Sequence, residues 1–137
     1  VINRNGTMPT GVKSLNGESR NVKWTERIQK IIASKSDFII LPIDPTHPFT
    51  IGKSHNKLVD GLACGTMVLA SGQDSYLKFS DYAYVNDNFV DNMIECLNNP
   101  AQTLERIRLG QEYIQQNLSD IKIAEQWVEV VKELSNE

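Results

Sequence analysis

Hydrophobic residues occur along the chain in two different spacings. In several stretches they recur three or four positions apart, which predicts one-sided helices. Between these stretches lie two short continuous apolar runs, FIIL at residues 38–41 and MVLAS at residues 67–71, which are typical of strands buried on both faces. Strands that alternate with helices predict an α/β fold, in which a parallel sheet is covered by helices on both faces.

Local signals at the ends of these stretches place the expected elements. Thr25 is a plausible N-cap for the first helix and Gly65 a natural C-cap for the second. The segment at residues 4–21 contains three glycines and a proline, and it predicts irregular structure. The expected strands lie at residues 1–3, 22–24, 38–41, 67–71 and 82–85. The expected helices begin near residues 25, 54–56, 86–88, 100 and 119.

The last third of the chain is expected to be a helical tail. One face of its first helix is marked by Leu104, Ile107, Gln111 and Ile114, and Gly110 is a weak point within this helix. Ser119 is expected to cap the last helix. The residues expected to face inward on that helix are Ile121, Ala124, Trp127, Val128, Val131 and Leu134. Trp24, in the expected strand at residues 22–24, is also expected to pack against other side chains.

Composition narrows the function classes. The chain has 137 residues, of which 40% are hydrophobic and 23% charged, so we expect a single domain with its own core. A net charge of -3 gives no electrostatic basis for nucleic-acid binding. No apolar run is long enough to span a membrane or to form a signal peptide, so a cytoplasmic location is expected. Cys64 and Cys96 lack the spacing of metal ligands and are expected to be reduced packing residues.

Candidate chemistry gathers in the loop that follows residues 38–41. Ligands of open parallel sheets bind beyond the carboxyl ends of the strands, where helix N-termini attract anions. This loop ends in a set of cationic and polar residues, followed by a further lysine in the helix. They are Lys53, Ser54, His55, Asn56 and Lys57. A phosphate group is the ligand that these residues favour, and the alternative is a solvated loop with Ser54 as an ordinary helix cap.

Asp60, His47 and His55 each have more than one interpretation. Asp60 could accept a bidentate pair of hydrogen bonds from a ribose diol, or could simply favour the helix dipole. His47 and His55 could act as a general base or as phosphate donors, and the alternative for His47 is an exposed loop residue. The chain has no Walker A loop, GxSxG elbow or GxGxxG turn, which weakens hydrolase, NTPase and dinucleotide-oxidoreductase interpretations.

The stretch at residues 36–71 resembles the nucleotide-sugar half of a two-Rossmann-domain (GT-B type) glycosyltransferase of the family 4-like, group 1 kind. Those domains show an aspartate that opens a strand ending in proline, then a loop, a lysine, an acid three residues later, and A-x-G before a valine-rich strand. The residues that carry the pattern here are Asp37, Pro42, Lys57, Asp60, Ala63, Gly65 and Val68. The segments at residues 21–24 and 99–114, and the final S-x-x-x-x-A, also match, so the resemblance spans residues 21–134.

The resemblance implies a role for each matched position. Asp60 takes the place of the glutamate that holds the ribose hydroxyls of the donor, and Ser54, His55 and Asn56 lie where the diphosphate and sugar are met. Many members carry a second glutamate eight positions before the ribose acid, where this chain has Gly52. A retaining mechanism that depends on a carboxylate at that position is therefore not expected, and the catalytic residues stay unassigned.

The resemblance also implies that the chain is a partial, C-terminal domain of a longer enzyme. Its partners would be a nucleotide-diphosphate sugar and, through the missing domain, a glycan or lipid-linked acceptor of polysaccharide or cell-envelope synthesis. No cofactor or metal is expected. Peripheral association of the whole enzyme with a membrane is expected. Alone, the chain should bind donor weakly and transfer nothing. A non-catalytic nucleotide-binding or receiver-like α/β module, or another enzyme on the same fold, is the alternative.

Overall fold

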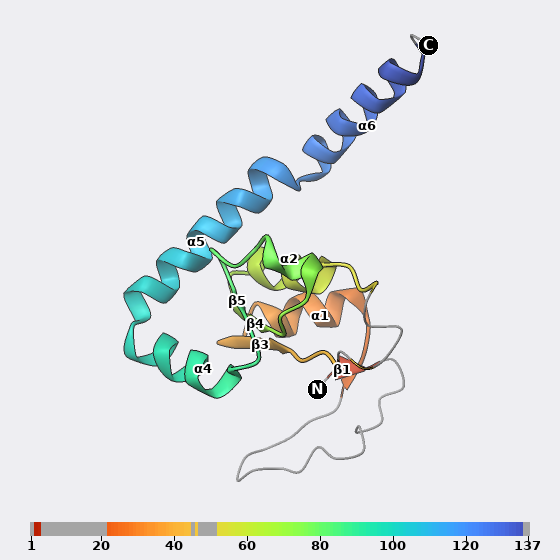
Figure 1. Ribbon diagram of the computed structural model, residues 1–137. Helices are drawn as coiled ribbons and strands as arrows, with labels where there is room; N and C mark the ends of the chain where they lie inside the picture. Colours follow the sequence, from red (N-terminus) through yellow and green to blue (C-terminus); the bar gives the residue numbers. More distant parts are fainter. Residues whose placement is uncertain (1, 4–21, 45, 47–51, 136–137) are drawn as a thin grey trace.

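The computed structural model describes residues 2–3, 22–44, 46 and 52–135. Within them the chain forms two parallel sheets (Figure 1). The smaller pairs β1 (Ile2–Asn3) with β2 (Val22–Lys23). The larger has the order β3 (Phe38–Leu41), β4 (Met67–Ala70) and β5 (Tyr84–Val85). The expected α/β fold with a parallel sheet is therefore confirmed, whereas the irregular segment expected at residues 4–21 lies outside the described residues.

The first helix begins, and the second helix ends, as the capping residues predict. Thr25 precedes α1 (Glu26–Ala33), and its side chain accepts a hydrogen bond of 3.1 Å from the Ile28 N–H. After α2 (Asn56–Ala63), Gly65 has a φ of +78°, a left-handed conformation that glycine adopts without steric cost. Both caps were predicted correctly because each signal is local.

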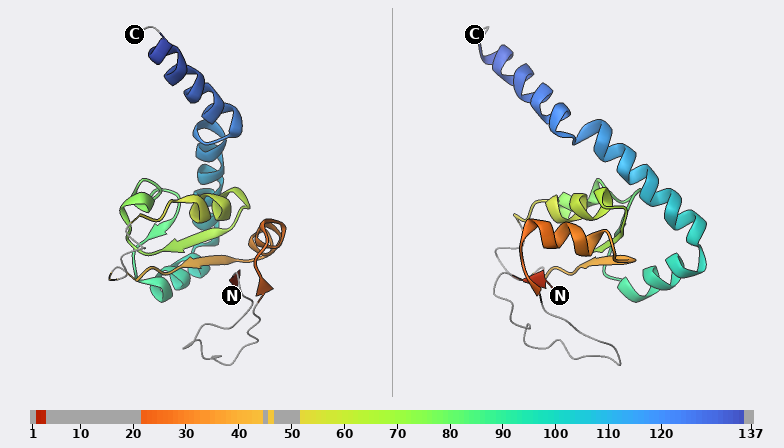
Figure 2. Two further views of the ribbon diagram at one scale, coloured as in Figure 1. Left: turned by 90° about the vertical axis from the view of Figure 1, so that its right-hand side faces the viewer. Right: turned by 180° about the vertical axis from the view of Figure 1, so that it is seen from behind.

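The core is divided by β4, whose four residues are all buried. Because side chains alternate along a strand, Val68 and Ala70 pack with residues of α2, while Met67 and Leu69 pack on the other face. The second face is covered by α4 (Phe89–Asn98) and by Ile107 of α5 (Pro100–Asn117). Helices thus cover both faces of the sheet, as the apolar run at residues 67–71 predicts (Figures 1 and 2).

The expectation that a continuous apolar run is buried on both faces is wrong for β3. Ile40 is 46% exposed, although its neighbours Ile39 and Leu41 pack against the core. Among the described residues, β3 is paired on one side only, with β4. A continuous apolar run therefore does not distinguish a central strand from an edge strand that has one open face.

A short helix, α3 (Asp74–Leu77), follows β4 and was not predicted. It has one turn, which is too short to show a helical stripe. It nevertheless supplies Tyr76 to the core, next to Phe79. This segment also fixes the loop before α2, as described below.

The helical tail is confirmed, but its packing differs from expectation at Gly110. A Cβ added at this position would lie 3.1 Å from Tyr82 Cβ and 3.4 Å from Leu62 Cδ1. Gly110 is therefore a close-packing point between α5 and the core rather than a weak point. Leu104, expected on the inner face, is instead 67% exposed.

The last helix, α6 (Asp120–Ser135), is present, but the expectation that its apolar residues face inward is wrong. It buries none of its residues. Trp127 is 67% exposed, and the other large apolar residues expected inward are exposed as well: Ile121, Val128, Val131 and Leu134. In Figures 1 and 2 this helix leads away from the sheet and its covering helices. The stripe identifies an apolar face but not what covers it. Trp24 is also exposed, against expectation.

None of the described helices combines the length and apolar character that crossing a membrane requires. Cys64 and Cys96 are both free, as expected, and Cys96 belongs to the buried core.

Candidate functional site

The carboxyl ends of the three parallel strands β3, β4 and β5 lie at one edge of the larger sheet. Hydrogen bonds join the loops that leave the first two strands. The Ser71 N–H donates to the Leu41 carbonyl at 3.1 Å, and the Ile43 N–H donates to Ser71 Oγ at 2.9 Å. These two bonds therefore hold the first residues after β3 against the start of the loop that follows β4. The candidate residues lie further along the loop that leaves β3.

The far end of that loop is held by residues around α3. The carbonyl oxygen of Lys53 accepts hydrogen bonds from Gln73 Nε2 at 2.9 Å and from Ser75 Oγ at 2.8 Å. These bonds bring the approach to α2 against the segment that follows β4. Sequence reasoning missed Gln73 and Ser75, because nothing in the local pattern links them to Lys53, which lies 20 and 22 positions earlier.

The first turn of α2 presents backbone donors. His55 occupies the N-cap position and its side chain makes no capping hydrogen bond, so the alternative in which Ser54 is an ordinary helix cap is wrong. The N–H groups of Leu58 and Val59 both donate to the His55 carbonyl at 3.0 Å. Within the described part of the chain, the N–H groups of Asn56 and Lys57 have no carbonyl acceptor. Such a helix start carries a partial positive charge and attracts anions.

The His55 side chain packs rather than projecting freely into solvent. Its ring lies 5.3 Å from the Phe79 ring, centroid to centroid, at an interplanar angle of 44°. Burial, and secondarily the charge of Lys78, lower the pKa of His55 from its ordinary value. The imidazole is therefore neutral at pH 7, and it can offer an anion one N–H donor but no charge.

Asp60, one turn into α2, is half-buried and faces α1. Its Oδ2 accepts a hydrogen bond of 2.7 Å from Gln29 Nε2. The Gln29 Oε1 in turn accepts a bond of 2.6 Å from the Trp24 indole N–H. Sequence reasoning placed Asp60 in the site but did not find Gln29, which lies 31 positions earlier in the chain.

All six residues of the predicted binding set lie at or near the start of α2. Lys53, Ser54, Asn56 and Lys57 are exposed, while His55 and Asp60 are half-buried. The set combines two lysines, two backbone donors that lack a carbonyl acceptor among the described residues, and one carboxylate. His47 lies outside the described residues. The Asp44 carboxylate oxygen Oδ1 accepts from the backbone N–H and the hydroxyl of Thr46, at 2.9 and 2.6 Å, in a local turn.

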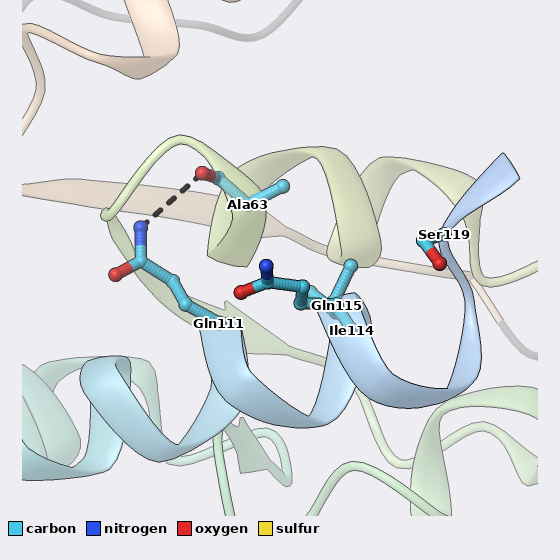
Figure 3. Close-up of a pocket in the computed structure, with 5 residues that line it drawn as sticks. All are labelled: Ala63, Gln111, Ile114, Gln115 and Ser119. Atoms are coloured by element: carbon cyan, nitrogen blue, oxygen red, sulfur yellow. Dashed lines mark hydrogen bonds between the residues drawn. The ribbon is translucent and has the colours of Figure 1, made fainter. Parts of the chain in front are cut away.

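A hollow of about 420 Å³ lies elsewhere, between α2 and α5 (Figure 3). It is lined by Ala63, Gln111, Ile114, Gln115 and Ser119. The Gln111 amide points across it to the Ala63 carbonyl, to which it donates at 3.3 Å. The lining holds no charged side chain, so this hollow does not suit a diphosphate.

The described residues contain no group of three or more His, Cys, Asp or Glu side chains that could hold a metal ion. Comparison with known proteins found no matching family model, no matching curated protein and no matching solved structure.

Proposed function

We propose that the chain binds the nucleoside-diphosphate part of a nucleotide sugar, as the donor half of a glycosyltransferase. The observation that carries this proposal is the start of α2. There, two backbone N–H groups without a carbonyl acceptor among the described residues belong to Asn56 and Lys57, Lys57 adds a positive charge to the same turn, and a carboxylate follows one turn later at Asp60. Donors and cations suit a diphosphate, whereas a carboxylate suits the hydroxyl groups of a ribose.

The chemical contribution of such a site would be to stabilise the leaving group. When the sugar is transferred, the acceptor hydroxyl oxygen forms a bond to the anomeric carbon and gives up its proton to a base that, like the acceptor, would lie outside the described residues. The bond between the anomeric carbon and the diphosphate oxygen breaks, and its electron pair stays on the diphosphate. Fixed backbone dipoles and Lys57 stabilise that charge without reorganising. Asp60 contributes to binding through the ribose and takes no part in bond breaking. The acceptor would bind outside the described residues, and we retain the cytoplasmic location expected from the sequence.

The first experiment is a ligand-observed NMR screen of the protein with UDP, GDP, ADP and CMP. Asp60→Asn removes the charge but keeps the shape and one oxygen acceptor for Gln29. We expect one diphosphate to bind and its affinity to fall in Asp60→Asn, because one good charge-assisted hydrogen bond contributes about 1.5–3 kcal/mol. The matched control is Asp120→Asn, which changes an exposed acid in the first turn of α6.

A second substitution separates the two halves of the proposed ligand. Lys57→Gln should weaken binding of the diphosphate but leave binding of the corresponding nucleoside unchanged, because only the former carries the charges that Lys57 contacts. Lys132→Gln on α6 is its control. A folded protein that binds none of the four nucleotides would contradict the proposal. Equal binding by the wild type and Asp60→Asn would contradict the ribose role alone.

A further inference from the structure

The hydrogen-bond chain from Trp24 through Gln29 to Asp60 fixes the orientation of an amide. An indole N–H can only donate, so the oxygen of the Gln29 amide must face Trp24, at 2.6 Å. The amide nitrogen must then face Asp60, at 2.7 Å, where the carboxylate can only accept. Both ends of the Gln29 amide are therefore occupied by partners of the correct polarity, and neither can be exchanged by rotating the amide.

This arrangement constrains the Asp60 carboxylate. One of its oxygens is held by a residue of a different helix, which limits rotation of the carboxylate about its own axis. Each carboxylate oxygen has two acceptor positions, so Oδ1 and the second lone pair of Oδ2 still accept. Two adjacent acceptors in a fixed plane match two adjacent hydroxyl groups, which is the geometry of a ribose diol.

The two residues also lie at the correct edge of the fold. Ala33, the last residue of α1, accepts a hydrogen bond of 2.5 Å from Thr66 Oγ1, just before β4 begins. The C-terminus of α1 is thus at the amino edge of the sheet, and its N-terminus points to the carboxyl edge, like that of α2. Gln29 and Asp60 each lie about one turn inside their helices, counted from these N-termini.

We propose that Gln29 is a positioning residue, which holds the plane of the Asp60 carboxylate so that it accepts both hydroxyl groups of a ribose. This inference rests on the proposed function. Without Gln29 the carboxylate would have to be ordered when the nucleotide binds, and that cost would reduce affinity. The competing explanation is that the bond only ties α1 to α2, with no effect on ligand discrimination.

The test compares ribonucleotides with analogues that lack the diol. The variant is Gln29→Leu, which removes both polar atoms of the amide at similar volume. The control is Arg27→Leu, an exposed position on the same helix. The probes are UDP, GDP and ADP, each beside its 2′,3′-dideoxy counterpart, with Kd measured by calorimetry and folding checked by circular dichroism.

We expect Gln29→Leu to weaken binding of the ribonucleotide roughly 3- to 10-fold, as for loss of one hydrogen bond, and to leave the dideoxy analogue within about 2-fold. Trp24→Phe, which removes the donor that orients Gln29, should move the ribonucleotide in the same direction by less. A purely structural role predicts equal losses for both ligands, or none, and either result would overturn the inference while leaving the proposed function intact.

Two outcomes in the wild type are also decisive. If it binds a diphosphate but does not distinguish the ribose from the dideoxy sugar, Asp60 does not contact the diol and the role of Gln29 is refuted, although the diphosphate site stands. If it binds none of the six nucleotides, the proposed function fails and the inference fails with it.

Discussion

The close approach of α2 to the sheet at Gly61 gives a sharp stability prediction. A Cβ at this position would lie 2.7 Å from Val68 Cγ2 and 2.9 Å from Ile39 Cδ1. Both distances are well inside van der Waals contact. Val68 is β-branched and fully buried, so its methyl group has little freedom to move. Sequence reasoning alone gives the opposite expectation, because alanine is about 1 kcal/mol better than glycine inside a helix.

The structure allows the two effects to be compared for Gly61→Ala. Overpacking a well-filled core costs about 1–3 kcal/mol, and two contacts below 3.0 Å place this site in the upper part of that range. After the gain in helix propensity, the net loss of unfolding free energy is roughly 1–2 kcal/mol. For a domain of this size, that corresponds to a Tm lower by roughly 3–8 °C.

The assay is thermal and urea unfolding followed by circular dichroism. Gly52→Ala is the control, because no atom lies within 4 Å of a Cβ at that position, and its Tm should stay near the wild-type value. In the double variant Gly61→Ala/Val68→Ala the combined loss should be smaller than the sum of the single losses, since the new methyl group fills space that Val68 leaves. A Tm that rises in Gly61→Ala would refute the close packing of α2 on β3 and β4.

Two further predictions concern the site and the tail. The pKa of His55 is lowered in the folded state, so the stability that this residue contributes is present above the ordinary histidine pKa of about 6.5 and is lost as pH falls toward the folded-state value. His55→Gln should therefore flatten the fall of stability in urea unfolding measured between pH 7 and pH 5. An unchanged slope would refute packing of the His55 ring on Phe79. Because α6 buries none of its residues, a chain that ends at Ser119 should keep its Tm. By contrast, Leu62→Ala, at a fully buried position, should lower the free energy of unfolding by about 2–5 kcal/mol. A large loss of Tm on truncation would mean that α6 packs on the sheet domain.

Features set by neighbouring residues were predictable from the sequence. The Thr25 cap depends on an N–H three residues later, and the left-handed Gly65 depends only on its own missing side chain. The strands at β3 and β4 follow from continuous apolar runs, and the helical tail from its periodicity. In each case the physical cause lies within about one turn of the residue concerned.

Features set by distant residues were not predictable in the same way. Gly110 looks unfavourable within its helix, and only the presence of Tyr82 and Leu62 explains it. The exposed apolar face of α6 and the open face of β3 at Ile40 follow the same rule: a pattern states that a face is apolar but not which element covers it.

The candidate site shows both kinds of information. The sequence places the binding set near the start of α2, since lysines, polar residues and a helix start occur together there. It does not show that His55 packs on Phe79 and loses basicity, nor that Gln73 and Ser75 hold the loop at Lys53. Those contacts join segments that meet only when the parallel strands align their carboxyl ends.

The packing of α2 connects the fold to the proposed function. Leu58 and Leu62 are buried on its core side, and Gly61 brings its backbone against the sheet. These contacts fix the depth and rotation of the helix. Lys57 and Asp60 belong to the same rigid turn, so their positions relative to the sheet edge are fixed as well. A helix of eight residues that is anchored through its own core face holds its N-terminal donors in place without a side-chain cap. The side chain of the N-cap residue His55 makes no capping hydrogen bond to those donors, as the proposed binding of a diphosphate at this helix start requires.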